Sequence, residues 1–530
     1  MRSSFSPVAL SCGIMLLTAA STWAGASRPA IPTSDLAGIV RAENGQPVSE
    51  ALVTARNDQK KVSVSVYTSA AGRFEFSNLW DGNYRVTARK TGLQSSPLET
   101  RVARGKAVSD LRLALPSSAQ PLVKTDPEFL RDLPDGEGKS LVRSVCIQCH
   151  GLTEQIAFQK KTPQEWALSV DSMLAKIAPL PAGQREIILD FLNAHFGPTS
   201  SREKNTDVLE MAGDYAANVV ITEYDMPPHK GETYEKTAGA KVTAHDVRVD
   251  KNGNVWISEM GRDALVMLNP KDATYKEYDI AYPGSAPHGI IIDKKGDIWV
   301  TLIWADRILK FDPVLEKFTV DFKIPAPQSW PHTNVVDSKG RIWVTEMYGN
   351  AIGRYDPSDN SFKRYPVPTP RATPYGLTVD QQDNVWFTGI TYHKFGKINA
   401  ADDKITEYPT PTPLSATRKM AVDKQGIVWC TEFGVGKLAK MDPATGNITE
   451  YNLPSKYSSP YDVTVAPDGK IWFPDFTGNN IISFDPITEK FLQYRIPTDF
   501  SRPRIVDIGK DGVVWFSESE AGRVARLEIR

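Results

Sequence analysis

The clearest chemical signal in the sequence is a short cysteine–histidine motif. Cys146, Cys149 and His150 form the pattern C-x-x-C-H, the spacing used for covalent attachment of a c-type haem. Two thiols three residues apart on one helical turn can add to the two vinyl groups of haem, and the following histidine then faces the iron. We therefore predict that Cys146 and Cys149 bind haem c and that His150 is an iron ligand.

Three other uses of this motif fit the sequence less well. A zinc site needs four ligands, and no second pair of ligands lies in the same small segment. A thioredoxin-like redox pair expects a βαβ setting, which the surrounding residues do not show. A simple disulfide between the two cysteines would leave His150 without a role.

The sixth iron ligand is open between two residues. Met173 lies 23 residues after His150, and a thioether ligand there would raise the reduction potential and suit electron transfer. His195 is the alternative ligand. Met173 would otherwise be an ordinary methionine of the apolar core. Without either ligand the haem would be five-coordinate and open.

Three helices are expected to position this motif, over residues 138–145, 163–173 and 182–196. The second has good start signals, with Thr162 at the N-cap, Pro163 at the first helical position and Glu165 at the third. The whole segment 138–198 resembles a small cytochrome c domain, with Trp166 and Met173 as in the haem domains of quinohaemoprotein amine dehydrogenases.

The C-terminal part of the chain is an internal repeat with a period of about 43 residues. Seven tryptophans mark it, with successive gaps of 43, 44, 43, 43, 43 and 43 residues, at positions 256, 299, 343, 386, 429, 472 and 515. Each repeat shows four short strands, which is the unit of a β-propeller blade. We predict a seven-bladed propeller over residues 216–530. The last repeat lacks its fourth strand, and Val219–Met226 has the sequence to supply it and close the ring.

A second candidate site follows from this repeat. The first strand of a blade lines the central channel, so residues where it begins should gather at one mouth of the channel. These residues are His245, His288, His332, Tyr375, Arg418, Tyr461 and Arg504. The residues three after each tryptophan should reach the same mouth and include five carboxylates, Glu259, Glu346, Glu432, Asp475 and Glu518, beside Leu302 and Gly389. We predict a functional polar funnel; the alternative is an ordinary solvated rim.

The repeated phrases of the blades strongly resemble the propeller of streptogramin B (virginiamycin B) lyases. In that family a histidine, a glutamate, a tyrosine and a magnesium ion carry the elimination of a C–O bond. The resemblance implies His288, His332, Tyr375 and Glu346 as catalytic residues and a divalent cation such as Mg²⁺ in the funnel. The sequence departs from the family at Trp330, where the family has an acid.

The N-terminal part predicts export followed by a small β domain. Met1–Ala26 has the charge, apolar stretch and Ala-x-Ala ending of a cleaved signal peptide, so we expect a periplasmic or otherwise exported protein. Residues 35–115 alternate in short strands separated by glycines and resemble the carboxypeptidase regulatory-like (transthyretin-like) domain, which implies a non-catalytic seven-strand sandwich. The expected fold is mainly β and multidomain: a β-sandwich, a small all-α cytochrome c-like domain and a seven-bladed propeller.

Composition narrows the function further. The net charge is −1, so nucleic-acid binding and attachment to an anionic membrane lose their electrostatic drive, and we expect no transmembrane anchor. Cys430 lies in a predicted buried strand, so we predict that it is a core residue rather than a nucleophile. We favour an exported electron-transfer protein whose propeller binds a substrate or a redox partner. The alternatives are a metal-assisted lyase with an accessory haem domain, and a non-catalytic binding scaffold.

Overall fold

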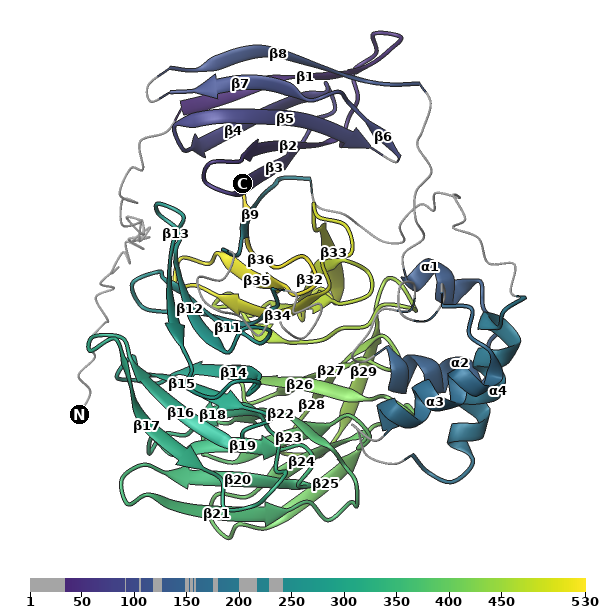
Figure 1. The fold of residues 1–530 in the computed structure, drawn as a ribbon, viewed down its shortest axis with the longest axis vertical. Coiled ribbons are helices and arrows are strands. Elements are labelled where there is room, and N and C mark those ends of the chain that lie inside the picture. The colour runs from purple at the N-terminus through teal and green to yellow at the C-terminus, as the bar shows by residue number, and fades with distance from the viewer. Residues whose placement is uncertain are drawn as a thin grey trace, which may run out of the picture.

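The computed structural model describes residues 34–90, 92–103, 106–117, 126–147, 152, 156, 159–174, 180–199, 217–227 and 242–530. The predicted signal peptide, Cys149 and His150 lie outside the described residues. The fold is mainly β. Figure 1 shows a sandwich of strands at the top, a propeller below it and a group of helices beside the propeller.

Six blades of the propeller are separate four-stranded antiparallel sheets. Blades one to three are β10 (Ala244–Val249), β11 (Val255–Glu259), β12 (Ala264–Asn269) and β13 (Thr274–Asp279); β14 (Pro287–Ile292), β15 (Ile298–Leu302), β16 (Arg307–Asp312) and β17 (Lys317–Lys323); and β18 (Pro331–Val336), β19 (Ile342–Glu346), β20 (Ala351–Asp356) and β21 (Ser361–Pro366). Blades four to six are β22 (Pro374–Val379), β23 (Val385–Gly389), β24 (Lys394–Ile398) and β25 (Ile405–Pro409); β26 (Thr417–Val422), β27 (Val428–Glu432), β28 (Lys437–Met441) and β29 (Ile448–Asn452); and β30 (Thr464–Val465), β31 (Ile471–Asp475), β32 (Asn480–Asp485) and β33 (Lys490–Arg495).

The repeating tryptophans are buried in the second strand of each blade, and a side-chain hydrogen bond explains part of their spacing. In the first five blades the indole N–H donates to an aspartate six residues earlier, over 2.9–3.2 Å. The same aspartates accept amide hydrogens of the turn between the first two strands, for example in Asp293. Blades six and seven have Ala466 and Gly509 at that position, so this hydrogen bond cannot form there.

The seventh blade is closed by a strand from far upstream, as the sequence predicts. It consists of β34 (Pro503–Ile508), β35 (Val514–Glu518), β36 (Arg523–Ile529) and β9 (Val219–Asp225). β9 pairs antiparallel with β36 along its whole length, from Val219 opposite Ile529 to Asp225 opposite Arg523. The two ends of the propeller sequence are therefore joined by backbone hydrogen bonds.

The N-terminal sandwich has eight strands, one of them only two residues long. They are β1 (Ser34–Ala42), β2 (Leu52–Asn57), β3 (Val62–Tyr67), β4 (Arg73–Leu79), β5 (Gly82–Lys90), β6 (Leu93–Gln94), β7 (Leu98–Val102) and β8 (Val108–Leu115). One sheet has the order β4-β1-β8. The other continues directly into blade seven, because β3 pairs with β9 from Val62–Tyr224 to Val66–Val220. Sandwich and propeller thus share one nine-stranded sheet. In Figure 1 its sandwich strands lie above β9 and its blade-seven strands below.

The helical segment, residues 126–199, contains α1 (Asp126–Arg131), α2 (Glu137–Leu141), the π-helical turn η1 (Val142–Cys146), α3 (Pro163–Leu174) and α4 (Gln184–Phe196). The amide of Ile147 donates to the carbonyl of Val142, five residues back, which makes the π-helical turn. At the start of α3, Thr162 and Glu165 form the reciprocal hydrogen bonds of a capping box. Among the described residues, no helix is both long enough and apolar enough to cross a membrane.

Candidate functional site

The side chains that begin the first strands gather around the propeller axis, as the repeat predicts. Three histidine rings from blades one to three stack in sequence, with centroids 3.7 Å apart for His245–His288 and 3.8 Å apart for His288–His332. The ring of Tyr375 in blade four follows at 3.9 Å from His332. These four side chains are almost fully buried. We call His245, His288 and His332 the histidine arc.

The other side of the channel carries tyrosine and arginine. The hydroxyls of Tyr375 and Tyr461 are hydrogen-bonded to each other, and Arg504 Nη1 donates to the Tyr461 hydroxyl over 3.0 Å. The guanidinium of Arg418 lies over both tyrosine rings, 4.6 Å from Tyr375 and 4.5 Å from Tyr461, and 4.3 Å from Phe433. This tyrosine–arginine arc fills its half of the channel with aromatic rings and fixed positive charge.

A second layer of charged residues lies one position further along the first strands. Asp246 Oδ1 and His245 Nδ1 are 2.9 Å apart, and the other carboxylate oxygen accepts the Ile290 amide. Lys419 Nζ crosses from blade five to blade three and donates to Thr333 Oγ1 over 2.8 Å. Asp246 and Lys419 were not among the site residues predicted from the sequence. The next position of the repeat would have shown them, because it holds the charged residues Asp246, Lys419 and Asp462 beside Thr333, Ile505 and two glycines.

Burial decides the charge state of the histidine arc. Removal from water lowers the pKa of His245 to about 4, although the neighbouring Asp246 partly opposes the shift. Burial also lowers the pKa values of His288 and His332 well below the ordinary value, and neighbouring positive charges add to the effect. All three imidazoles are therefore neutral at pH 7. They are available as bases or as metal ligands.

The two tyrosines of the opposite arc are shifted in opposite directions. Burial raises the pKa of Tyr375 well above the usual value. Burial acts on Tyr461 in the same way, but the positive charges of Arg504 and Arg418 outweigh it and lower the pKa. Tyr461 is therefore the more acidic member of the pair.

The five carboxylates three residues after each tryptophan do not join the histidines in the way we expected. Glu346 accepts two hydrogen bonds of 2.9 Å from Arg364 Nε, which lies on the outermost strand of the same blade. It lies across Gly353 of the third strand, where a Cβ would come within 3.1 Å of Glu346 Oε1. Glu432 and Glu518 likewise interact with acidic residues of their fourth strands, Glu450 and Glu223. Glu346, Glu432 and Glu518 therefore face the outer strands of their blades. Glu259 and Asp475 instead accept amide hydrogens from Thr243 and Ser459, just before the first strands.

Three of the four predicted lyase-type residues lie together, since His288, His332 and Tyr375 are in continuous ring contact. The fourth, Glu346, is engaged with Arg364, and burial raises its pKa despite that partner. Cys430 is fully buried among apolar residues of blades four and five, as expected of a core residue, and burial raises its pKa well above the usual value.

The predicted haem ligands are only partly described. Cys146 ends the π-helical turn and packs, half-buried, against the core of the helical segment. Met173 is 43 % exposed, whereas Trp166 on the same helix is buried and donates its indole N–H to the Phe196 carbonyl over 3.2 Å. His195 is half-buried, with its ring 4.6 Å from that of Phe191. Cys149 and His150 lie outside the described residues.

The helical segment is docked on the mouth of the propeller. Asp126 forms a buried ion pair with Arg502, two residues before Arg504 of the arc. Arg143 Nη2 donates to the Ser458 carbonyl over 2.7 Å, and Lys139 Nζ donates to the Tyr457 hydroxyl over 3.1 Å. All three contacts reach loops that precede the first strands of blades six and seven, at the same end of the channel as the arcs.

A continuous buried cluster connects the two regions. Phe476 packs on Tyr461 with ring centroids 5.7 Å apart, and Phe433 does so at 6.0 Å. Both phenylalanines belong to one large buried cluster that includes Leu141 and Val142 of the helical segment and extends into the sandwich. A direct approach is seen beside Phe433, where a Cβ on Gly434 would come within 3.2 Å of Ser144 Cβ. The segment that carries the first motif cysteine therefore lies over the tyrosine–arginine arc.

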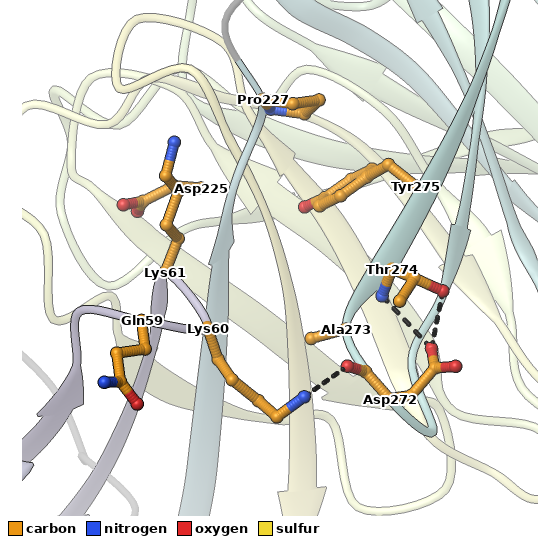
Figure 2. A pocket seen from close by; sticks show the side chains of 9 residues that line it. All are labelled: Gln59, Lys60, Lys61, Asp225, Pro227, Asp272, Ala273, Thr274 and Tyr275. Atoms are coloured by element: carbon orange, nitrogen blue, oxygen red, sulfur yellow. Dashed lines mark hydrogen bonds between the residues drawn. The ribbon is translucent and has the colours of Figure 1, made fainter. Parts of the chain in front are cut away.

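A pocket of about 290 Å³ lies elsewhere, between the sandwich and blade one. The turn between β2 and β3 lies on one side of it and the turn between β12 and β13 on the other, and Lys60 donates to the Asp272 carbonyl over 2.9 Å. Figure 2 shows Tyr275 and Asp225 on its walls. None of the predicted site residues lines this pocket.

The fold and site define a seven-bladed propeller joined to a β-sandwich and a helical segment, and comparisons with known proteins assign two of these parts. Residues 227–483 match the virginiamycin B lyase family. Residues 35–116 match the carboxypeptidase regulatory-like domain. Two regions of the chain are therefore similar to known domains, the propeller to the lyase family and the sandwich to the regulatory-like domain.

Solved structures agree with this assignment at the level of fold. Selenomethionine-substituted virginiamycin B lyase from Staphylococcus aureus is 23 % identical, with a TM-score of 0.53 over 59 % of this chain and 100 % of that chain. A streptogramin B lyase structure is 24 % identical, with a TM-score of 0.53 over 59 % of this chain and 98 % of that chain. A catalytically inactive variant of the S. aureus enzyme with quinupristin matches equally well, at 23 % identity and a TM-score of 0.53. No curated protein matches the chain.

Proposed function

We propose that this protein is an exported c-type haem protein for electron transfer, in which the lyase-like propeller binds the substrate or redox partner. The observation that carries the proposal is the position of the Cys146 helix over the tyrosine–arginine arc. A molecule bound at the mouth of the propeller would lie beside the segment that holds the haem motif. The signal-peptide pattern of residues 1–26 supports the proposal, because haem c is attached outside the cytoplasm.

The described residues fit such a group. Cys146 is half-buried at the end of a helix and stands next to a compact apolar core that includes Trp166, Leu192 and Phe196. Cys146 and Cys149 would form the thioether bonds, His150 would bind the iron, and Met173 or His195 would supply the sixth ligand. The exposed thioether of Met173 is accessible to a bound group. Haem would supply one-electron transfer. The buried aromatic cluster of Phe433, Phe476 and Tyr461 excludes water between the segment and the funnel.

The test is the absorption spectrum of the purified exported protein, together with haem detection after denaturation. We expect a c-type spectrum and haem that stays with the unfolded chain. Cys149→Ser should abolish or weaken the covalent attachment, whereas Cys430→Ser, a matched cysteine in the propeller core, should not. A wild-type protein without covalent haem, expressed with a haem-attachment system, would disprove the proposal.

A second candidate function is a metal-assisted lyase acting in the funnel, with the haem domain as an accessory. The continuous contact of His288, His332 and Tyr375 favours it, because these residues match phrases of the lyase family. His332 is neutral and can accept a proton, but its lowered pKa makes it a weaker base than an ordinary histidine. Incubation with quinupristin tests this function. Ring opening that is lost in His332→Ala with an unchanged haem spectrum would favour the lyase, and no turnover by wild type would reject it for this substrate.

A further inference from the structure

The histidine arc also takes part in a group of three ligand-type side chains, of which the proposed lyase function uses only His288. A ring nitrogen of His245, a ring nitrogen of His288 and a carboxylate oxygen of Asp246 all lie within 4.8 Å of one another. His245 and Asp246 come from blade one and His288 from blade two, so the propeller ring brings them together. All three side chains are at most 3 % exposed.

One of these ligand atoms has no partner among the described residues. His288 Nδ1 is buried and makes no hydrogen bond, although His245 Nδ1 is held by Asp246 and His332 Nδ1 contacts Thr333 Oγ1 at 3.1 Å. A buried ring nitrogen without a partner is unfavourable, and a bound cation would satisfy it. The rings are also neutral, which is the form that binds metals.

We propose that His245, Asp246 and His288 bind a divalent transition-metal ion inside the channel. Two imidazoles and one carboxylate are a donor set typical of zinc and its first-row neighbours rather than of magnesium, which prefers oxygen ligands. Ligand atoms of a tetrahedral ion lie about 3.4 Å apart at usual zinc distances. The three ligand atoms here lie within 4.8 Å of one another, so they would move closer together when the ion binds. The remaining coordination positions would be open to a small ligand in the channel.

The positive charge of Lys419 near the proposed ligands allows a specific test of the metal site. Lys419 is near enough to lower the pKa values of both His245 and Asp246. A metal ion at this site would therefore be repelled by Lys419, and removing that charge should tighten metal binding. A zinc site elsewhere on the protein would not respond to this change.

The experiment is equilibrium dialysis of the whole haem-loaded protein against Zn²⁺, with zinc and iron counted in the same sample. We expect one zinc per wild-type chain, binding about 10-fold weaker or worse in His245→Ala and Asp246→Asn, and tighter binding in Lys419→Met. The matched control is His332→Gln, which removes the next ring of the arc and should keep the zinc. Every variant retains the C-x-x-C-H motif, so differences between them exclude zinc held there.

Three results would overturn the proposal. The first is a wild-type protein that binds no zinc although its iron content shows that haem is present. This result does not depend on the folding of any variant. The second is binding that is equal in wild type, His245→Ala and Lys419→Met. The third is a loss in His332→Gln as large as in His245→Ala, which would assign a different set of ligands. Thermal unfolding of each variant distinguishes a lost ligand from a lost fold.

Discussion

The sandwich and the helical segment are both held on the propeller, but by different kinds of contact. The sandwich is joined through the backbone, because β3 adds to β9 over five residue pairs. The helical segment is joined through buried charged side chains, led by Asp126–Arg502 and by Arg143 on the Ser458 carbonyl. A backbone ladder tolerates most side-chain changes, whereas a buried charge depends on its partner. One joint is therefore robust, and the other can be broken by single substitutions.

The largest effect is expected at the helical joint. Arg502→Met removes the positive charge that faces the buried Asp126 carboxylate, which would keep its hydrogen bond from the Leu152 amide. This loss of charge pairing should weaken docking of the segment by about 3–5 kcal/mol. Hydrogen exchange should show loss of protection in α1 and α2 with little change in β3. The double variant Asp126→Leu, Arg502→Met should regain most of the loss. Equal loss of protection in β3 and α2 would contradict the separation of the two joints.

The side chains at the sandwich joint should matter less than those at the helical joint. Trp80 packs near Tyr224, with ring centroids 6.2 Å apart, and donates its indole N–H to the Lys271 carbonyl over 3.1 Å. Trp80→Ala should loosen the sandwich by about 3 kcal/mol, through lost packing, while the ladder persists. The measurement is hydrogen exchange of β3, and Trp304→Ala, at an exposed tryptophan, is the control. If Trp80→Ala also separates β9 from β36, the backbone pairing of β3 with β9 depends on the packing of Trp80, which would contradict the prediction.

Acid should act on the body of the propeller rather than on the sandwich joint. The pKa of His245 is about 4 in the folded protein and about 6.5 when unfolded, so only the unfolded chain takes up a proton as the pH falls below 6.5. Stability should therefore decrease by about 2 kcal/mol between pH 7 and pH 5 from this residue. Denaturant unfolding at several pH values measures the slope, and His245→Asn should flatten it. An unchanged slope would show that His245 is not buried in neutral form.

The smallest effect is expected for an ion pair at the sandwich joint. Arg56 pairs with Asp225 of β9, but both side chains are partly exposed, at 20 % and 24 %. Arg56→Gln should cost no more than about 1 kcal/mol, because exposed pairs contribute little. Arg143→Gln, at a buried arginine of the helical joint, should cause a larger loss of protection in the same hydrogen-exchange experiment. Similar losses in the two variants would contradict this prediction.

The blades could be predicted because their signals are local and repeated. Each tryptophan lies a fixed distance after its turn aspartate, and Val219–Met226 resembles the fourth strand that the last repeat lacks. The joint with the sandwich has no such signal. Val62–Tyr67 alternates valine and serine, which indicates a strand with one exposed face, yet Ser63 and Ser65 are buried because β3 lies between β2 and β9.

The candidate site was predicted in part for the same reason. Repeat position alone identified the histidine arc and its order around the axis. It misplaced the carboxylates, because Glu346 pairs with Pro331 and lies one residue out of step with His332. Side chains one residue apart along a strand point to opposite faces of the sheet, so Glu346 does not share a face of the blade with His332. Docking of the helical segment over the mouth could not be read from sequence, since it depends on loops of blades that are far apart in the chain.

The position of β9 between β3 and β36 has a consequence for the order in which the protein forms. During synthesis the sandwich emerges first, β9 follows it, and β36 is the last strand to be made. For most of that time β9 has only one of its two neighbours, and that neighbour is β3. The closing strand of the ring can therefore pair with the sandwich before β36 has been made. The sandwich covers one edge of a valine- and isoleucine-rich strand until the end of the chain arrives to cover the other.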